Sequence, residues 1–207
     1  MEETVVVIHG SKYPNPNTKN LFLRNLVRFG YKIFKVTPDM EYPEVREKWL
    51  SKIAKKGRDI LYFDWEGKPL PKYVNKAAQD LINLIKTKDN VKIITNSIGA
   101  AIALKVSERV NNVKKIISLS GVYRKSKADV DFLDVRSKDD KFANVCKAGL
   151  NLLSFTKMKN RKLVLIEKFR HHEFQKDKQI TGGNFKGMNI SQILEYFLSK
   201  ETQNQNI

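Results

Sequence analysis

A serine lies at the point where a short apolar segment gives way to an alanine-rich one. Residues 91–105 read VKIITNSIGAAIALK, with Ser97 at the centre of the change. A β-branched strand, a sharp turn with a central serine and a helix together form a nucleophile elbow. Such an elbow would present the Ser97 hydroxyl at a strained tip and set helix N–H groups where an oxyanion forms. The alternative is that Ser97 only caps the helix, a role that serine fills well.

The turn departs from the usual G-x-S-x-G pattern at one position. Thr95 stands where the first glycine is expected. Only small residues fit there, because the backbones of the strand and the helix pass closely. Gly99 and the two alanines after it keep the other side of the turn small. Thr95 therefore requires that the turn open slightly or that its neighbours give way.

Acidic and imidazole side chains follow Ser97 in the order that one class of serine chemistry uses. Asp139 and Asp140 come after one expected strand, and His171 and His172 come after the next. A serine nucleophile needs a base that takes its proton and an acid that orients the base, here in the chain order Ser, Asp, His. Each aspartate could instead cap a helix, and each histidine could be an exposed loop residue.

The segments that must position these groups alternate between strand and helix patterns. Strands are expected at 5–9, 32–36, 59–65, 91–95, 114–120, 130–136 and 163–166. Helices are expected at 21–29, 44–55, 74–85, 99–110, 140–153 and 190–198. This alternation predicts a three-layer α/β fold, with a mostly parallel central sheet covered by helices on both faces. In such sheets the site lies at the carboxyl ends of the strands, where all the candidate residues fall.

Composition narrows the class of protein further. The 207 residues are enough for a single domain, expected over 1–200 with a polar tail at 201–207. No apolar run approaches the ~20 residues of a membrane span, and the acidic start does not resemble a signal peptide. A single cysteine, Cys146, argues against a disulfide framework and favours a cytoplasmic location. No Cys/His cluster has zinc spacing, so neither a metal nor a cofactor is predicted.

The net charge of +17 is spread along the chain in short lysine-rich clusters. A protein of this charge is attracted to polyanions such as nucleic acid or anionic lipid. Because no cluster is long, we expect at most a weak attraction to anionic surfaces and no specific nucleic-acid partner.

Several of these motifs together resemble a known group of enzymes. The pair His9-Gly10, the segment TNSIGAA around Ser97, the segment RSKDDKF at 136–142 and the late histidine look like the α/β-hydrolase fold. The chain is most similar to small serine hydrolases related to retinoblastoma-binding protein 9 and the YdeN-type esterases. Pro38-Asp39, followed by Arg46 and Trp49, matches another segment of that group. The resemblance covers most of the chain, from residue 5 to about 198.

The resemblance implies a role for each candidate. It implies Ser97 as the nucleophile and the second acid of the pair, Asp140, as the residue that orients the base. It favours His171 over His172 as the base, because a Lys-Leu pair lies at the family's distance before it. The backbone N–H of Ile98 and a second one near Ser11 would form the oxyanion hole.

The implied activity is hydrolysis of a small or medium acyl ester through an acyl-enzyme. The short gap between residues 120 and 130, where many relatives insert a helical lid, predicts that no large lid domain is present. Two other functions fit the same fold. One is a binding protein with a degenerate triad, and the other is a lipase-like enzyme that acts at anionic membranes.

Overall fold

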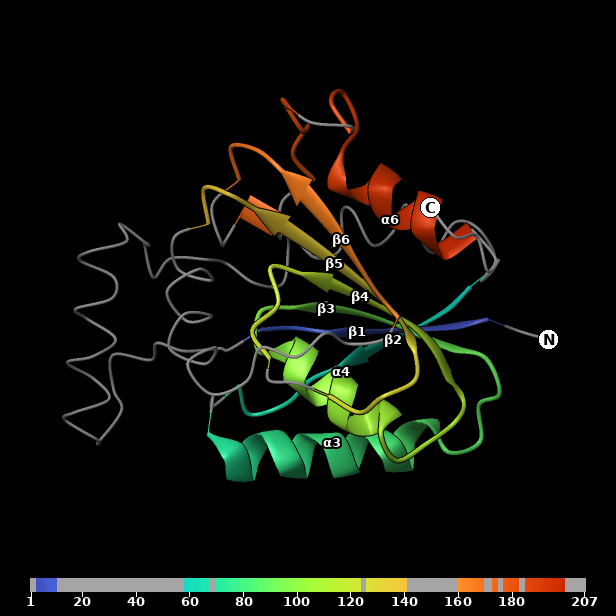
Figure 1. Cartoon of the computed structure of the whole chain (residues 1–207). Helices are drawn as coiled ribbons and strands as arrows, with labels where there is room; N and C mark the ends of the chain where they lie inside the picture. The colour runs from blue at the N-terminus through green and yellow to red at the C-terminus, as the bar shows by residue number, and fades with distance from the viewer. Residues whose placement is uncertain are drawn as a thin grey trace, which may run out of the picture.

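The computed structural model describes residues 3–10, 58–67, 70–123, 126–140, 160–169, 173–174, 177–182 and 185–199. Within them, six strands form one parallel sheet in the order β2-β1-β3-β4-β5-β6 (Figure 1). The strands are β1 (Thr4–Ile8), β2 (Asp59–Phe63), β3 (Val91–Asn96), β4 (Val113–Leu119), β5 (Asp131–Ser137) and β6 (Arg161–Ile166). The described helices are α3 (Pro71–Ile85), α4 (Gly99–Ser107) and α6 (Ile190–Ser199).

The direction of strand addition reverses at β1. The chain places β2 on one side of β1 and then β3 on the other, and Ile8 of β1 lies in register with Phe63 of β2 and with Thr95 of β3. In open parallel sheets a ligand site forms beyond the carboxyl ends of the strands at such a reversal. The ends of β1 and β3 are therefore where this fold is suited to hold a site.

Helices cover both faces of the sheet, α3 and α4 on one side and α6 on the other (Figure 1). Alternate residues of β1 enter the two cores. Val6 and Ile8 belong to the cluster that includes α3 and α4, and Val5 and Val7 to the cluster that includes α6. A strand buried on both faces must be apolar throughout, which is why these central strands read as continuous Val and Ile runs. The predicted three-layer α/β fold is confirmed.

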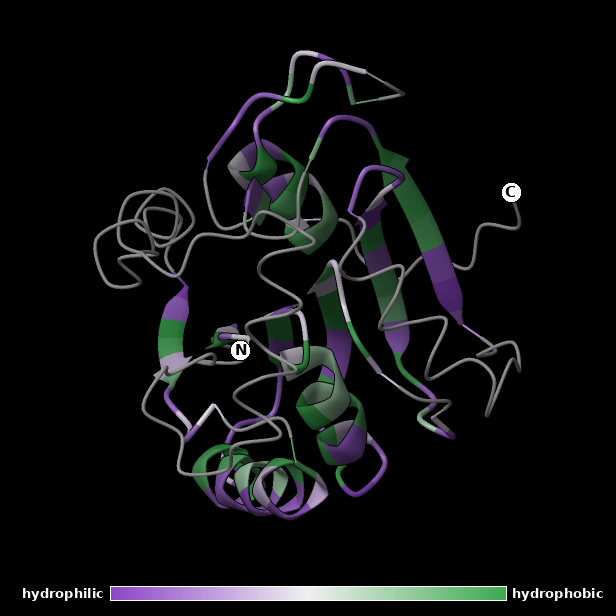
Figure 2. Cartoon of the chain, turned by 90° about the vertical axis from the view of Figure 1, so that its left-hand side faces the viewer, coloured by the Kyte–Doolittle hydropathy of each residue, from purple (hydrophilic) through white to green (hydrophobic). Residues whose placement is uncertain are grey.

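Helix α3 shows how one face of a surface helix is buried. It starts at Pro71, whose fixed φ and missing N–H suit a first helical position. Its buried residues recur every three or four positions; they are Val74, Ala77, Ala78, Leu81 and Ile85. Polar and charged residues occupy most of the other positions (Figure 2), while Ile82 is partly buried and Leu84 is exposed.

In the described ranges, most of the predicted strands and helices begin and end within a few residues of their predicted bounds. The strand predicted at 59–65 ends at Phe63, and the helix predicted at 99–110 ends at Ser107. The segment from 120 to 130 carries no inserted domain between β4 and β5. Elements predicted at 21–29, 32–36, 44–55 and 140–153, together with Cys146 and the tail, lie outside the described residues.

Two lysines of the sheet hold the carboxyl end of α6. The ammonium groups of Lys92 on β3 and Lys115 on β4 donate to the carbonyls of Leu198 (2.7 Å) and Phe197 (2.9 Å). Cations suit the last turn of a helix, where carbonyls lack intrahelical partners and the dipole is negative. Burial lowers the pKa of Lys115, and Asp131 at 3.4 Å partly opposes this shift. Some of the chain's positive charge is thus structural.

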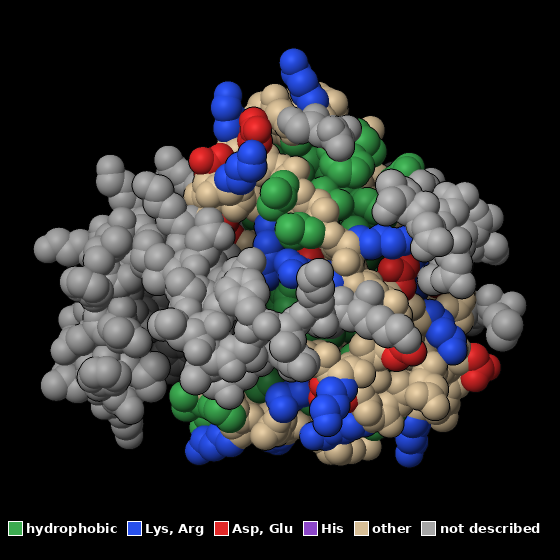
Figure 3. Space-filling model, viewed as in Figure 1, with side chains coloured by type: hydrophobic (Ala, Val, Ile, Leu, Met, Phe, Trp, Pro, Cys, Tyr) green, Lys and Arg blue, Asp and Glu red, His purple; other side chains and the backbone are tan. Residues whose placement is uncertain are grey.

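On the face shown in Figure 3, the basic side chains of the described residues lie at several separate places, with acidic side chains among them. This agrees with the dispersed pattern of the sequence, in which no long basic run occurs. Of the helices in the described ranges, none has both the length and the apolar character needed to cross a membrane.

A buried ionic cluster joins the middle of β5 to its neighbours. Asp134 is fully buried, and its Oδ2 accepts hydrogen bonds from Tyr123 (2.7 Å), Arg136 (2.5 Å) and Arg161 (2.7 Å). Arg136 also donates to the carbonyl of Gly121 at 3.2 Å. Burial lowers the pKa of Arg136, but the charges of Asp134 and Tyr123 and the hydrogen bonds to these two residues together outweigh burial, so the pKa is raised. A buried carboxylate needs such partners, because an unpaired one would be too costly to desolvate.

Tyr123→Phe tests this cluster through alkaline stability. Burial, and then the charge of Asp134, raise the pKa of Tyr123 above its ordinary value of 10. The folded state therefore keeps a proton that the unfolded state loses above pH 10, and the stabilisation present below pH 10 declines as the pH rises further. We expect Tyr123→Phe to be less stable by about 1.5–3 kcal/mol at pH 7, and we expect this difference to shrink above pH 10. Urea unfolding of both proteins from pH 7 to 11 measures this, and a constant difference would contradict it.

Candidate active site

Ser97 lies in the tight turn between β3 and α4. Its φ of +52° falls in the left-handed region, which costs an L-residue roughly 1–2 kcal/mol. Three backbone hydrogen bonds hold it there. Its N–H donates to the carbonyl of Leu119 (3.1 Å), and its carbonyl accepts from Val122 (2.9 Å) and Ala100 (3.2 Å). A serine held in this conformation between a strand and a helix is what a nucleophile elbow requires.

Two glycines allow other backbone to pass close to this turn. A Cβ at Gly10, after β1, would lie 3.0 Å from the Cβ of Ser97. A Cβ at Gly99, at the start of α4, would lie 2.3 Å from Oγ1 of Thr95 and 3.0 Å from the carbonyl oxygen of His9. The end of β1 therefore runs directly beside the elbow.

The same geometry explains how Thr95 is accommodated. The threonine is buried, and its hydroxyl fills the space that a side chain at Gly99 would need. That hydroxyl has no hydrogen-bond partner among the described residues, so within them it adds bulk to the turn without a polar contact. Threonine can therefore replace the first glycine of the pattern at position 95 because the last glycine, Gly99, has no side chain.

His9 lies beside the elbow, and its side chain contacts the residues that follow β2. Its Nδ1 donates to the carbonyl of Gly10 (2.6 Å), and its Nε2 lies 2.9 Å from Asp64 and 3.3 Å from the N–H of Trp65. The indole of Trp65 stacks on the imidazole and donates to the backbone carbonyl of His9 at 3.0 Å. If the ring is neutral, Nε2 accepts from Trp65, and if it is charged, Nε2 donates to Asp64.

The two candidate acids lie in very different surroundings. Asp140 is 1% exposed, and its carboxylate accepts a hydrogen bond from the hydroxyl of Ser120. Asp139 is exposed and accepts from the backbone N–H of Lys168 at 2.7 Å. A buried, hydrogen-bonded carboxylate is the kind that can fix an imidazole, whereas the exposed carboxylate of Asp139 ties this segment to the backbone after β6.

Of the remaining predicted residues, only Ile98 is described. It lies at the N-cap of α4, the end where backbone N–H groups lack intrahelical acceptors and favour negative charge. His171, His172 and Ser11 fall outside the described residues. The structure brings Ser97 and Ile98 together in one turn, and Asp140 follows the end of β5 at the same edge of the sheet.

Sequence analysis missed the turn after β4. Ser120 also has a left-handed backbone, with φ of +51°, and is 1% exposed. The residues on either side of it, Leu119 and Val122, are those that bond the backbone of Ser97. The only signal in the sequence is a Ser-Gly pair after an apolar strand, which is typical of an ordinary turn.

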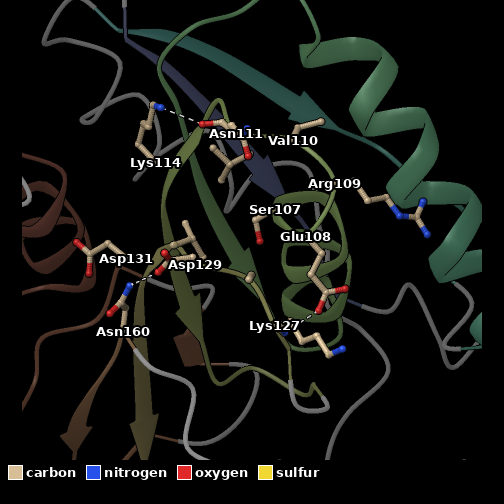
Figure 4. A pocket seen from close by; sticks show the side chains of 13 residues that line it. Ser107, Glu108, Arg109, Val110, Asn111, Lys114, Lys127, Asp129, Asp131 and Asn160 are labelled. Atoms are coloured by element: carbon tan, nitrogen blue, oxygen red, sulfur yellow. Dashed lines mark hydrogen bonds between the residues drawn. The ribbon is translucent and has the colours of Figure 1, made fainter.

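A large surface depression lies at the other end of the sheet. It has a volume of about 1100 Å³ and is lined by residues that follow α4 and that begin β4 and β5 (Figure 4). Glu108 there accepts from Ser126 (2.6 Å), and Asn160 donates to Asp129 (2.6 Å). Its acidic side chains are thus engaged in local bonds, far from the strand ends that carry Ser97. Among the described residues, no group of His, Cys, Asp and Glu could hold a metal ion.

Comparison with solved structures identifies the fold. The chain is similar to a lipase-esterase related protein from Clostridium acetobutylicum (TM-score 0.52, 17% identity, 94% of each chain). It is also similar to a bromoperoxidase from Bacillus anthracis (TM-score 0.53, 9% identity, 97% of this chain and 93% of that one). A third similar structure is MGS-MChE2, an α/β hydrolase from a sediment metagenome of the Mar Chica lagoon, Morocco (TM-score 0.50, 15% identity, 84% of each chain). No protein-family model and no curated protein matches the sequence. The chain has the α/β-hydrolase fold, as predicted.

A double-mutant cycle at Thr95 and Gly99 tests the packing of the elbow. We expect Gly99→Ala to destabilise the protein by about 1–3 kcal/mol, because the new Cβ meets the hydroxyl of Thr95. Thr95→Ala removes an unpartnered hydroxyl and should cost less. In the double variant part of the loss at Gly99 should be recovered, with a coupling of about 0.5 kcal/mol or more.

Thermal and urea unfolding of the four proteins give the coupling energy. Some loss should remain in the double variant, because the carbonyl of His9 still lies 3.0 Å from the new Cβ. Strictly additive effects would contradict this account of the turn.

Proposed function

We propose that this protein is a serine hydrolase that cleaves carboxylic esters through an acyl-enzyme. The observation that carries the proposal is the left-handed Ser97 between β3 and α4, beside Gly10 at the end of β1. That conformation is strained and must be held by its surroundings, and such strain clusters at functional sites. The α/β-hydrolase fold supports the reaction class by analogy.

In this proposal His171 takes the proton from the Ser97 hydroxyl as its oxygen attacks the ester carbonyl. Asp140 holds the imidazole in the correct tautomer and stabilises its charged form. The N–H groups of Ile98 and Ser11 donate to the oxyanion of the tetrahedral intermediate, and losing one such donor costs about 100- to 1000-fold in rate. The imidazolium then protonates the leaving alcohol. Water, deprotonated by the same base, releases the acid and restores Ser97.

The substrate class we propose is a small or medium acyl ester. The connection between β4 and β5 spans only 120–130, so it supplies no large cover over the strand ends. We further propose that residues 1–200 form one domain and that the protein acts in the cytoplasm, as the single Cys146 favours.

Ser97→Ala is the direct test of the nucleophile. We expect wild type to react covalently with a fluorophosphonate probe and to hydrolyse p-nitrophenyl acetate. Ser97→Ala should lose both, since removal of a catalytic serine costs on the order of 10⁶-fold in kcat. Ser107→Ala, at the far end of α4, is the matched control and should behave as wild type.

Peptide mapping of the labelled protein identifies the modified serine. A folded wild-type protein that neither labels nor hydrolyses any ester of a p-nitrophenyl panel would refute the proposal and favour the binding protein on the same fold. Hydrolysis that rises with anionic vesicles and falls with added salt would favour the lipase-like enzyme.

Adjacent pairs allow the base and the acid to be assigned separately. We expect His171→Ala to lower kcat by on the order of 10⁶-fold and Asp140→Asn by on the order of 10⁴-fold, as loss of these roles does in serine enzymes. His172→Ala and Asp139→Asn should leave kcat within a few-fold of wild type. Circular dichroism and unfolding curves show whether each variant is folded. The opposite pattern within either pair would reassign that role to the neighbour.

A further inference from the structure

A second left-handed serine lies next to the proposed nucleophile. Ser120 follows β4, the strand paired with β3 on one side and with β5 on the other. Its φ of +51° nearly equals that of Ser97, and both residues end neighbouring strands. Apart from these two serines, only Lys168 is a non-glycine residue with positive φ in the described ranges.

The turn that contains Ser120 is hydrogen-bonded to the segment that carries Ser97 and to the side chain of Asp140. On one side, the carbonyl of Leu119 accepts from the Ser97 N–H (3.1 Å), and the N–H of Val122 donates to the Ser97 carbonyl (2.9 Å). On the other side, the hydroxyl of Ser120 donates to the carboxylate of Asp140. One short turn therefore fixes the elbow and the carboxylate relative to each other.

The choice of serine at position 120 is not explained by the backbone. Glycine occupies the left-handed region without steric cost, and Asn or Asp do so more often than serine. The backbone N–H of Ser120 donates to the carbonyl of Val135 (2.8 Å), a bond that any residue with an N–H could make. What serine adds is a hydroxyl, and that hydroxyl bonds a carboxylate that is 1% exposed.

We propose that Ser120 is a positioning residue of the hydrolase, whose hydroxyl fixes the orientation of the Asp140 carboxylate. This inference rests on the proposed function. A carboxylate can rotate about its terminal bond, and a donor on one oxygen restricts that rotation. Ser120 acts through Asp140 and does not touch the substrate. Its loss should therefore lower kcat and leave KM unchanged.

Ser120→Gly separates the hydroxyl from the backbone. Glycine suits the left-handed turn better than serine does, so this variant should fold at least as readily in the turn while lacking the donor. We expect kcat for p-nitrophenyl acetate to fall about 10- to 100-fold, the size of effect that is seen when residues that orient metal-binding side chains are removed. Ser120→Ala should show the same kcat with lower stability, because alanine is strained at positive φ.

Ser118→Ala is the matched control on the same strand. Ser118 is fully buried and its hydroxyl has no hydrogen-bond partner in the part of the chain that the structure describes, so its removal tests the effect of deleting a buried hydroxyl alone. We expect kcat within two-fold of wild type. In an Asp140→Asn background, Ser120→Gly should cost much less than it does alone, because the carboxylate it positions is gone.

The possible outcomes distinguish this inference from the proposed function. If wild type labels at Ser97 and turns over, and Ser120→Gly retains full kcat, the positioning role is refuted and the serine hydrolase stands. A change in KM alone, or full additivity with Asp140→Asn, would also refute it. If wild type neither labels nor hydrolyses esters, the proposed function and the role of Ser120 both fail.

Discussion

The left-handed backbone at Ser97 is the constraint around which this edge of the molecule is arranged. An L-residue reaches that conformation only when its surroundings offset a cost of roughly 1–2 kcal/mol. Here the turn after β4 supplies hydrogen bonds from Leu119 and Val122, and the helix supplies one from Ala100. The elbow therefore depends on two other segments, and damage to either of them should disturb it.

The parallel sheet explains why those segments meet. Its strands end together at one edge, so residues that follow β1, β3, β4 and β5 become neighbours although they are far apart in the chain. The approach is close enough that Gly10 and Gly99 have little room for a side chain. Such packing leaves few ways for the turn to relax, which keeps the serine in place.

The sequence predicted the parts of this edge that depend on local pattern. The β-branched residues 91–94 and the alanines after Gly99 predicted the strand and the helix, and the central serine predicted the turn between them. The strand predicted at 59–65 was too long. His9 contacts both Asp64 and the N–H of Trp65, and these two residues leave the ladder with β1. The pattern of residues 59–65 cannot show this contact, because His9 lies 55 positions before Asp64 in the chain.

The pairing of Ser120 with Asp140 was not predictable for a similar reason. Ser-Gly after a strand is typical of many turns, and nothing in it indicates a left-handed serine that bonds an acid twenty residues later. The burial of Lys115 was not predictable either, because two adjacent lysines in a strand are normally expected to be exposed to solvent. Its partner is the end of α6, which lies over it only in the folded chain.

Two buried aspartates of the same segment differ in what surrounds them, and this difference bears on function. Asp134 accepts hydrogen bonds from two guanidinium groups and a tyrosine, which stabilise its charge and tie it to neighbouring strands. Asp140 lies beyond the end of β5 and accepts from the neutral hydroxyl of Ser120. The two guanidinium groups compensate much of the negative potential of the Asp134 carboxylate. Burial alone therefore does not mark a catalytic acid, because Asp134 is as deeply buried as Asp140 and yet ties neighbouring strands together.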